Sequence, residues 1–405
     1  MQQDSAIEKQ NFDDRDKDGD VDFDVDLNLD IDVEDEGEKE DQEFYTPGPE
    51  ALYDTRLQIT ANSLTQAKQR LQRQYEALQG FDKTAYLQLR RAMYAKIDME
   101  LSLQGTQLVS NRFTSAISYS LGQIAVGAWD GSCYILDSQD LSVRKTYQNL
   151  HPEKLSGLDN SSNGETIATG GSDGINNIIQ GNTNTNTNTD VDSDAYATHK
   201  LTGHLVRINC VKFHQLNAYL ASASADLTWR LWDVPKQQEL YYQEGHSDAV
   251  NVLSHHPDGS LLASAGNDAI LKLWDLRSGN LILDLHENGH IKPIHSLYWR
   301  SNGYQIASGG ADGQLIIWDV RMGKKLTTVP AHNKLVSTLK FTTDDHETLV
   351  SAGYDGTVSL SSCDNWTVYK KFNTLDKIMA LDTFETNDRL NILTGGWDRS
   401  IKLYN

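Results

Sequence analysis

Residues 203–233 read GHLVRINCVKFHQLNAYLASASADLTWRLWD. The stretch opens on Gly203-His204 and closes on Trp232-Asp233, with short apolar runs between them, and two more copies of the pattern follow directly. The polar and aromatic residues that recur in the three copies are His204, Ser222, Asp226, Trp232, His246, Ser264, Asp268, Trp274, His290, Ser308, Asp312 and Trp318. Recurrence at a fixed spacing means that the chain repeats one supersecondary unit.

The aspartate of this unit recurs along the last three-quarters of the chain. The copies are Asp130, Asp173, Asp226, Asp268, Asp312, Asp355 and Asp398, at gaps of 43, 53, 42, 44, 43 and 43 residues. A period near 43 residues with a Trp-Asp ending is typical of a β-propeller with four strands in each blade. We therefore predict an all-β fold, a seven-bladed propeller over residues 106–405.

The repeat resembles the WD-repeat family, in which the His, Ser or Thr, Asp and Trp of a blade hydrogen-bond as a tetrad. An unpaired buried polar group costs about 1–3 kcal/mol, so we expect the set to be kept whole or lost together. The other units depart from the pattern, with Val126 in unit one, Ile179-Gln180 in unit two, Ser361-Ser362 in unit six and Tyr404-Asn405 in unit seven.

The recurring Ser, His and Asp could also suggest a hydrolase triad. Catalysis needs one site rather than seven spaced copies, and blade structure explains every copy. An enzyme would need a unique polar or metal cluster at the central channel, and we find none in the sequence. We expect no enzyme activity and no cofactor.

The sequence ends on the third strand of the last unit, so the outer strand of that blade must come from elsewhere. Gln107–Ser110, directly before the first unit, is the candidate. Pairing it with the last strand would close the ring and remove an exposed edge.

The net charge of −21 is unevenly distributed. Residues 1–43 hold 19 acidic and 4 basic side chains, too little apolar surface to offset chain entropy, and we predict a disordered acidic tail. Within it, residues 14–25 begin like a calcium loop but end on Val25 where a Glu is needed, so we predict no metal. Residues 21–33, VDFDVDLNLDIDV, alternate like a strand that could add to a partner's sheet, but a solvated tail is the better interpretation.

Three further features limit the class of protein. Cys133, Cys210 and Cys363 have neither metal-ligand spacing nor a disulfide pattern, which favours a reducing compartment. We find no signal peptide and no membrane-spanning run, and expect an intracellular protein. Residues 181–194, GNTNTNTNTDVDSD, are expected to form a flexible loop in blade two.

A helical arm is predicted over residues 44–105. Its first helix, from about Glu50 to Gln79, places four leucines seven residues apart along one side, and a second runs from Asp82 to Gly105. The leucines are Leu57, Leu64, Leu71 and Leu78. The basic candidates for RNA or partner binding are Arg56, Lys68, Arg70, Arg73, Arg90, Arg91 and Lys96. They form either an ordinary solvated face or a docking arm for RNA phosphates or an acidic protein.

Five segments narrow the family. They are FYTP (44–47), ELSLQGTQLVS (100–110), SASADLTWRLWD (222–233), SNGYQIASGGADG (301–313) and GGWDRSIKLYN (395–405). With the arm and the repeats, they resemble the pre-mRNA-processing factor 4 family, the WD-repeat proteins of the U4/U6 small nuclear ribonucleoprotein. The resemblance covers roughly residues 43–405.

The resemblance implies a nuclear, non-catalytic splicing scaffold in the U4/U6 and U4/U6·U5 particles. Its arm would engage a U4/U6-specific protein and U4/U6 RNA, and its propeller would dock other tri-snRNP proteins in a hetero-complex. Family members usually carry a Pro-Ile-Thr-Leu-Phe-Gly-like motif upstream of the acidic run. We find none, which leaves contacts made through it without support in this sequence and fits either a truncated chain or an incomplete gene model. The alternative is a WD-repeat adaptor outside splicing, whose arm binds one partner and no RNA.

Overall fold

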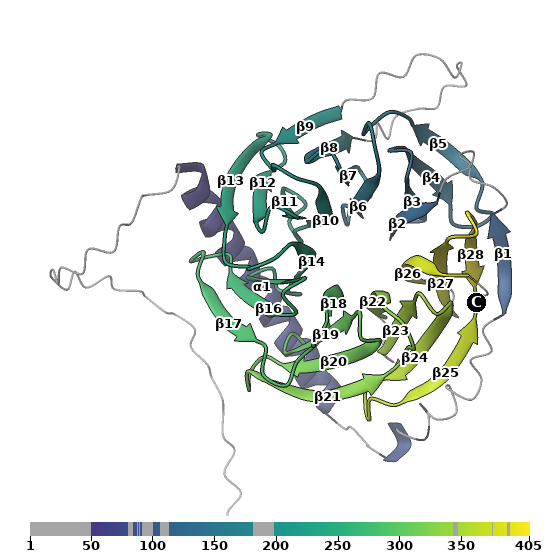
Figure 1. Cartoon of the computed structure of the whole chain (residues 1–405). Coiled ribbons are helices and arrows are strands. Elements are labelled where there is room, and N and C mark those ends of the chain that lie inside the picture. Colours follow the sequence, from purple (N-terminus) through teal and green to yellow (C-terminus); the bar gives the residue numbers. More distant parts are fainter. Residues whose placement is uncertain are drawn as a thin grey trace, which may run out of the picture. The chain divides into compact units, whose positions relative to one another are not determined.

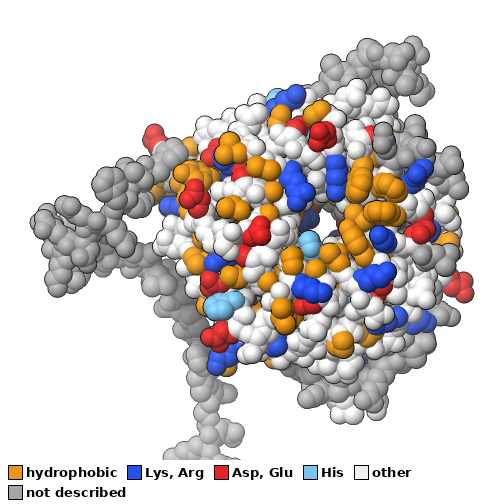
Figure 2. All heavy atoms as spheres, viewed as in Figure 1, with side chains coloured by type: hydrophobic (Ala, Val, Ile, Leu, Met, Phe, Trp, Pro, Cys, Tyr) orange, Lys and Arg blue, Asp and Glu red, His pale blue; other side chains and the backbone are white. Residues whose placement is uncertain are grey.

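The described residues form seven four-stranded antiparallel sheets arranged as blades around a central channel (Figure 1). The computed structural model describes residues 50–79, 84–86, 88, 90, 100–105, 113–180, 198–342, 347–374, 376–386 and 389–405. In Figure 2 the mouth of the channel is visible as a hollow within the ring. The predicted all-β WD-repeat propeller is confirmed.

In blades one to six the four strands follow the chain order from the channel outward. Blade one holds β2 (Thr114–Ser120), β3 (Gln123–Ala128), β4 (Cys133–Asp137) and β5 (Val143–Tyr147), and blade two holds β6 (Leu155–Asn160), β7 (Thr166–Gly171), β8 (Ile175–Gln180) and β9 (Thr198–Thr202). Blade three holds β10 (Ile208–Phe213), β11 (Tyr219–Ser224), β12 (Trp229–Asp233) and β13 (Gln238–Gln243), and blade four holds β14 (Val250–His255), β15 (Leu261–Gly266), β16 (Leu271–Asp275) and β17 (Leu281–Leu285).

The remaining blades complete the ring. Blade five holds β18 (Ile294–Trp299), β19 (Gln305–Gly310), β20 (Gln314–Asp319) and β21 (Lys324–Pro330), and blade six holds β22 (Val336–Phe341), β23 (Thr348–Gly353), β24 (Thr357–Ser362) and β25 (Val368–Asn373). Blade seven holds β26 (Ile378–Thr386), β27 (Arg389–Gly396), β28 (Ile401–Tyr404) and β1 (Leu101–Gly105).

Small residues let neighbouring blades pack closely. The second strand β11 reads YLASAS and is buried along its whole length. A Cβ on Gly157 of β6 would stand 2.9 Å from the backbone nitrogen of Val211 in the next blade, a distance that real Cβ atoms do not adopt. Large side chains fill the space between sheets instead, and Trp229, Trp232 and Trp318 are almost completely buried. The cores therefore lie between blades as well as within them.

The ring is closed by β1, which pairs antiparallel with β28, with Leu103 opposite Leu403. The prediction that a strand upstream of blade one closes the ring is confirmed, but the residues predicted to form that strand were wrong. Gln107–Ser110 lies outside the described residues, and the outer strand of blade seven is Leu101–Gly105, a segment that the sequence predicts as the end of the second helix. The sequence around Leu101 is compatible with a helix or a strand. It forms a strand because its backbone groups hydrogen-bond to the otherwise unpaired edge of β28.

One long helix, α1 (Glu50–Leu78), precedes β1. Its last turn agrees with the predicted end of the first helix near Gln79. No helix in the described ranges is long and apolar enough to cross a membrane. The predicted acidic tail with its calcium-like and alternating segments, most of the second helix, and the loop 181–194 lie outside the described residues.

Candidate functional site

The repeated tetrads are buried hydrogen-bond chains. In blade three, His204 Nδ1 lies 2.8 Å from Asp226 and His204 Nε2 lies 2.7 Å from the Ser222 hydroxyl. The Trp232 indole N–H donates to the same hydroxyl at 2.8 Å. Burial alone would raise the pKa of Asp226, but hydrogen bonds from His204 and Thr228 hold it below its ordinary value.

Blades four and five repeat this geometry. The equivalent contacts join His246, Ser264, Asp268 and Trp274, and His290, Ser308, Asp312 and Trp318, at 2.7–3.0 Å. The hydroxyls of Ser222, Ser264 and Ser308 belong to residues with no exposed surface. A substrate cannot reach a nucleophile placed in this way, so the tetrads hold the blades rather than perform chemistry.

Blades two and six keep the chain without the tryptophan. His151 lies 3.0 Å from both Asp173 and Thr169, and His332 lies 3.2 Å from Asp355 and 2.9 Å from Ser351. Also in blade two, the side-chain amide of Asn177 donates to the backbone oxygen of Leu150 at 2.7 Å.

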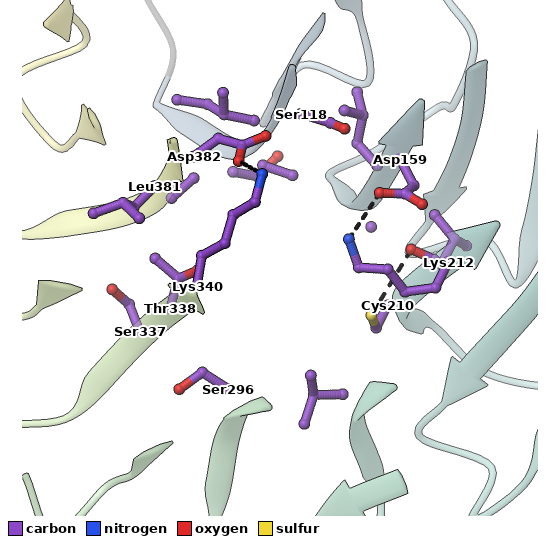
Figure 3. Close-up of a pocket in the computed structure, with 18 of the residues that line it drawn as sticks. Ser118, Asp159, Cys210, Lys212, Ser296, Ser337, Thr338, Lys340, Leu381 and Asp382 are labelled. Atoms are coloured by element: carbon purple, nitrogen blue, oxygen red, sulfur yellow. Dashed lines mark hydrogen bonds and ion pairs between the residues drawn. The ribbon is translucent and has the colours of Figure 1, made fainter. Parts of the chain in front are cut away.

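The central channel holds a cavity of about 300 Å³ with two ion pairs across blade boundaries (Figure 3). Lys212 of blade three lies 2.7 Å from Asp159 of blade two, and Lys340 of blade six pairs with Asp382 of blade seven. Burial would lower the pKa of each lysine, but the neighbouring carboxylate raises it above its ordinary value. In the part of the chain that the structure describes, no cluster of His, Cys, Asp or Glu could hold a metal ion. These paired charges join adjacent blades along the wall of the channel.

Helix α1 lies against the turns of blades three to five, and Arg70 fixes it there. The Arg70 guanidinium donates to both carboxylate oxygens of Asp258, at 2.9 and 2.6 Å, and to the backbone oxygen of Asn302 at 2.8 Å. The hydrogen bond with Asp258 raises the pKa of Arg70. Leu52 and Ile59 of α1 join the core that contains Tyr219.

Two other candidate arginines also contact the propeller. The Arg90 side chain is buried, lies 3.1 Å from Asp364, and donates to the backbone oxygen of Glu347 at 2.8 Å. The Arg56 guanidinium lies 5.8 Å from the centre of the Tyr241 ring, a distance typical of a cation–π contact. The expectation that these side chains and Arg70 occupy a free face is therefore corrected. Lys68 and Arg73 are exposed on α1, whereas Arg91 and Lys96 lie outside the described residues.

The opposite face of α1 carries an exposed apolar stripe, and the leucines predicted to share one side of the helix lie on this exposed side. The stripe consists of Tyr53, Leu57, Leu64, Leu71 and Tyr75, whose exposed fractions range from 53 to 66%. The docked face holds the buried Leu52, Thr55, Ile59 and Ser63. Both faces of α1 therefore carry apolar side chains, and among the described residues the propeller covers only one of them.

The chain is similar to known protein families and to known proteins. The WD domain, G-beta repeat family matches residues 368–405, and the N-terminal domain family of nucleolar protein 10-like proteins matches residues 209–386. The U4/U6 small nuclear ribonucleoprotein PRP4 of Saccharomyces cerevisiae is 44% identical over 375 residues, which cover 90% of this chain and 78% of the yeast protein. An uncharacterized WD repeat-containing protein of Schizosaccharomyces pombe is 33% identical over 204 residues, covering 45% of this chain and 39% of that protein.

Proposed function

This chain belongs to the family of yeast PRP4, and we propose that it is a non-catalytic scaffold subunit of the U4/U6 and U4/U6·U5 small nuclear ribonucleoproteins in the nucleus. The observation that carries the proposal is identity of 44% across 90% of the chain, since a likeness confined to the WD repeats would fit many unrelated partners. The buried tetrads and the paired charges of the channel support a role in binding rather than in chemistry.

The surface proposed for the U4/U6-specific protein partner is the exposed stripe of α1. Leucines seven residues apart on a helix make the seam that a second amphipathic helix covers. Burying one leucine is worth about 1.5–3 kcal/mol, so three of them could account for stable docking. The propeller fixes α1 through Arg70 before the partner arrives, which lowers the entropy cost of binding.

U4/U6 RNA is proposed to meet the remaining basic residues of the arm rather than the docked ones. Lys68 and Arg73 are exposed on α1, and phosphate contacts need only accessible positive charge. Arg91 and Lys96 complete the proposed set, and other particle proteins would dock on the propeller.

A pull-down of the tagged chain from nuclear extract, with the bound RNA and protein identified at low and moderately high salt, tests the proposal. We expect U4 and U6 RNA to be recovered with a U4/U6-specific protein. A variant carrying Leu57→Asp, Leu64→Asp and Leu71→Asp should lose the protein partner, because charge cannot be buried in the seam. The matched control carries Leu281→Asp and Leu326→Asp, which change exposed leucines of outer strands.

Each outcome bears on a different part of the proposal. Loss of both RNAs only at higher salt would indicate that phosphate contacts are the main tether. Retention of the partner by the α1 variant would reject the stripe but not the scaffold. Absence of both RNAs at low salt would reject the splicing role and favour a WD-repeat adaptor.

A further inference from the structure

The face of the propeller opposite α1 carries a group of aromatic rings beside the channel. Helix α1 contacts the turn between the first and second strands of blades four and five, at Asp258 and Asn302. Phe113, Trp129 and Trp397 lie at the other ends of such strands, because Phe113 precedes β2 and the two tryptophans follow β3 and β27. Figure 2 views this face and shows apolar side chains beside the channel near blades one and seven, with Lys and Arg next to them.

The three rings pack on one another. Phe113 and Trp397 are stacked with centroids 4.9 Å apart, and Trp129 meets Phe113 edge-on at 5.3 Å. Trp397 nevertheless keeps 38% of its surface exposed. A large apolar ring left in water at the end of a packed cluster is a common feature of protein interfaces.

Basic side chains flank the rings. The Lys377 ammonium lies 4.3 Å from the centre of a Trp397 ring, and the Lys154 ammonium lies 4.4 Å from Trp129. Arg207 is exposed nearby, and burial together with the Arg207 charge lowers the pKa of Lys154. Across the described ranges, none of these three cations forms an ion pair with an acidic side chain, although Glu153 and Asp376 are adjacent in sequence.

The repeat itself indicates that the fold does not require these residues. In every blade a backbone hydrogen bond joins the residue before the first strand to the residue before the conserved aspartate, as between Lys377 and Trp397 at 3.0 Å. In blades four and five the same two places hold Ala249 with Asn267, and Pro293 with Ala311. Blades four and five keep complete tetrads without an aromatic or basic residue there, so the group on blades one, two, three and seven serves another purpose.

The geometry favours a peptide over a single-stranded nucleic acid. Bases bind by stacking on free aromatic faces. Here Phe113 has Trp397 against one ring face and the Arg399 guanidinium 5.4 Å from its centroid, while Lys377 lies over Trp397. A carboxylate can approach the flanking cations without moving a ring, and an aliphatic or aromatic side chain can cover the exposed surface of Trp397.

We propose that the aromatic–basic rim, formed by Phe113, Trp129, Trp397, Lys154, Arg207 and Lys377, binds an acidic peptide segment of a partner protein. The carboxylates of the peptide would pair with the three cations, and one apolar side chain would lie on Trp397. The inference rests on the proposed docking role of the propeller but not on its assignment to splicing, so the two can fail separately.

The test uses the full chain and a library of short random peptides displayed on phage. We expect the selected peptides to be rich in Asp and Glu around an aromatic or leucine residue. A synthetic copy of the best peptide should bind a Lys377→Glu, Arg207→Glu variant at least about tenfold more weakly, because both contacts become repulsive. Lys324→Glu, which reverses one exposed charge on β21, is the matched control and should bind like the original chain.

Trp397→Ala separates the apolar contact from the charges, and should weaken binding while leaving its salt dependence in place. Thermal unfolding of each variant shows whether the fold is intact. The proposal is overturned if no acidic peptide is selected, or if the charge-reversal variant binds the peptide as tightly as the original chain. It is also overturned if a short single-stranded RNA competes for the rim and loses affinity in the same variants, which would indicate a nucleic-acid site.

Discussion

The hydroxyl of Ser264 connects two side chains that come from different parts of blade four. It accepts from the Trp274 indole and lies 2.7 Å from His246, which in turn meets Asp268. Ser264→Ala should leave the Trp274 indole N–H and His246 Nε2 buried without a hydrogen-bond partner, and lower the free energy of unfolding by about 1–3 kcal/mol. Urea unfolding measures this loss. Ser301→Ala, in an exposed turn, serves as the control, and an equal effect of both changes would contradict the tetrad's role.

His214 and His256 make a residue-scale prediction about pH. In each, Nε2 lies 2.8 Å from a backbone oxygen in the next blade, of Gly259 or Gly303, and Nδ1 accepts a backbone N–H two residues on. Both rings must therefore be neutral, and burial lowers the pKa of each. The unfolded chain takes up protons first as pH falls below the ordinary histidine pKa of about 6.5.

The contribution of these two histidines to folding stability should therefore be constant near neutral pH. It should fall as the pH drops below the ordinary histidine pKa of about 6.5 toward the lower pKa of the folded state. The measurement is the free energy of unfolding as a function of pH. His214→Gln should reduce the slope, whereas His286→Gln, at an exposed position, should not. A slope that is the same in all three proteins would show that the buried rings do not cause it.

At the scale of the element, Arg70 determines whether α1 stays on the propeller. Arg70→Gln removes the two-point contact and leaves the nearly buried Asp258 carboxylate without its cation. Because Arg70 is partly exposed to solvent, we expect a loss of about 1–2 kcal/mol and faster hydrogen exchange along α1. Arg73→Gln on the same helix is the control. Unchanged exchange in the Arg70 variant would mean that the Leu52 and Ile59 contacts hold α1 alone.

The strand β1 gives the second element-scale prediction. A chain that begins at Thr106 lacks β1 and exposes the hydrogen-bonding edge of β28. Such edges recruit other strands, so this chain should self-associate and unfold at lower temperature than one that begins at Glu100. Sedimentation and thermal unfolding compare the two chains, and equal behaviour would show that β28 is stable without its neighbour.

The sequence of α1 alone does not predict which of its faces packs on the propeller. Counting leucines at seven-residue intervals correctly placed Leu57, Leu64 and Leu71 on one side of α1. It could not show which side the propeller covers, because Leu52 and Ile59 give the docked face an apolar character too. The deciding partners, Asp258 and Asn302, lie in turns about 190 and 230 residues later, and no periodicity within the helix reports on them.

At the scale of the whole molecule, the repeat made the fold predictable. Seven aspartates at nearly equal spacing fix the number of blades, and the hydrogen-bonding residues of a blade recur at fixed distances from them. For the same reason, the repeat does not predict the aromatic–basic rim. Its members stand at positions where the repeat tolerates Ala249 or Pro293, so they become a group only when the ring brings blades seven and one together.

The pairing of β1 with β28 has a consequence for biosynthesis. The two strands are about 300 residues apart in the sequence, so β1 emerges from the ribosome long before β28 is translated. Blades three to five emerge in between, and with them the surface to which α1 docks. The nascent chain therefore holds one unpaired strand through most of its translation, and we expect molecular chaperones to shield Leu101–Gly105 until β28 leaves the exit tunnel.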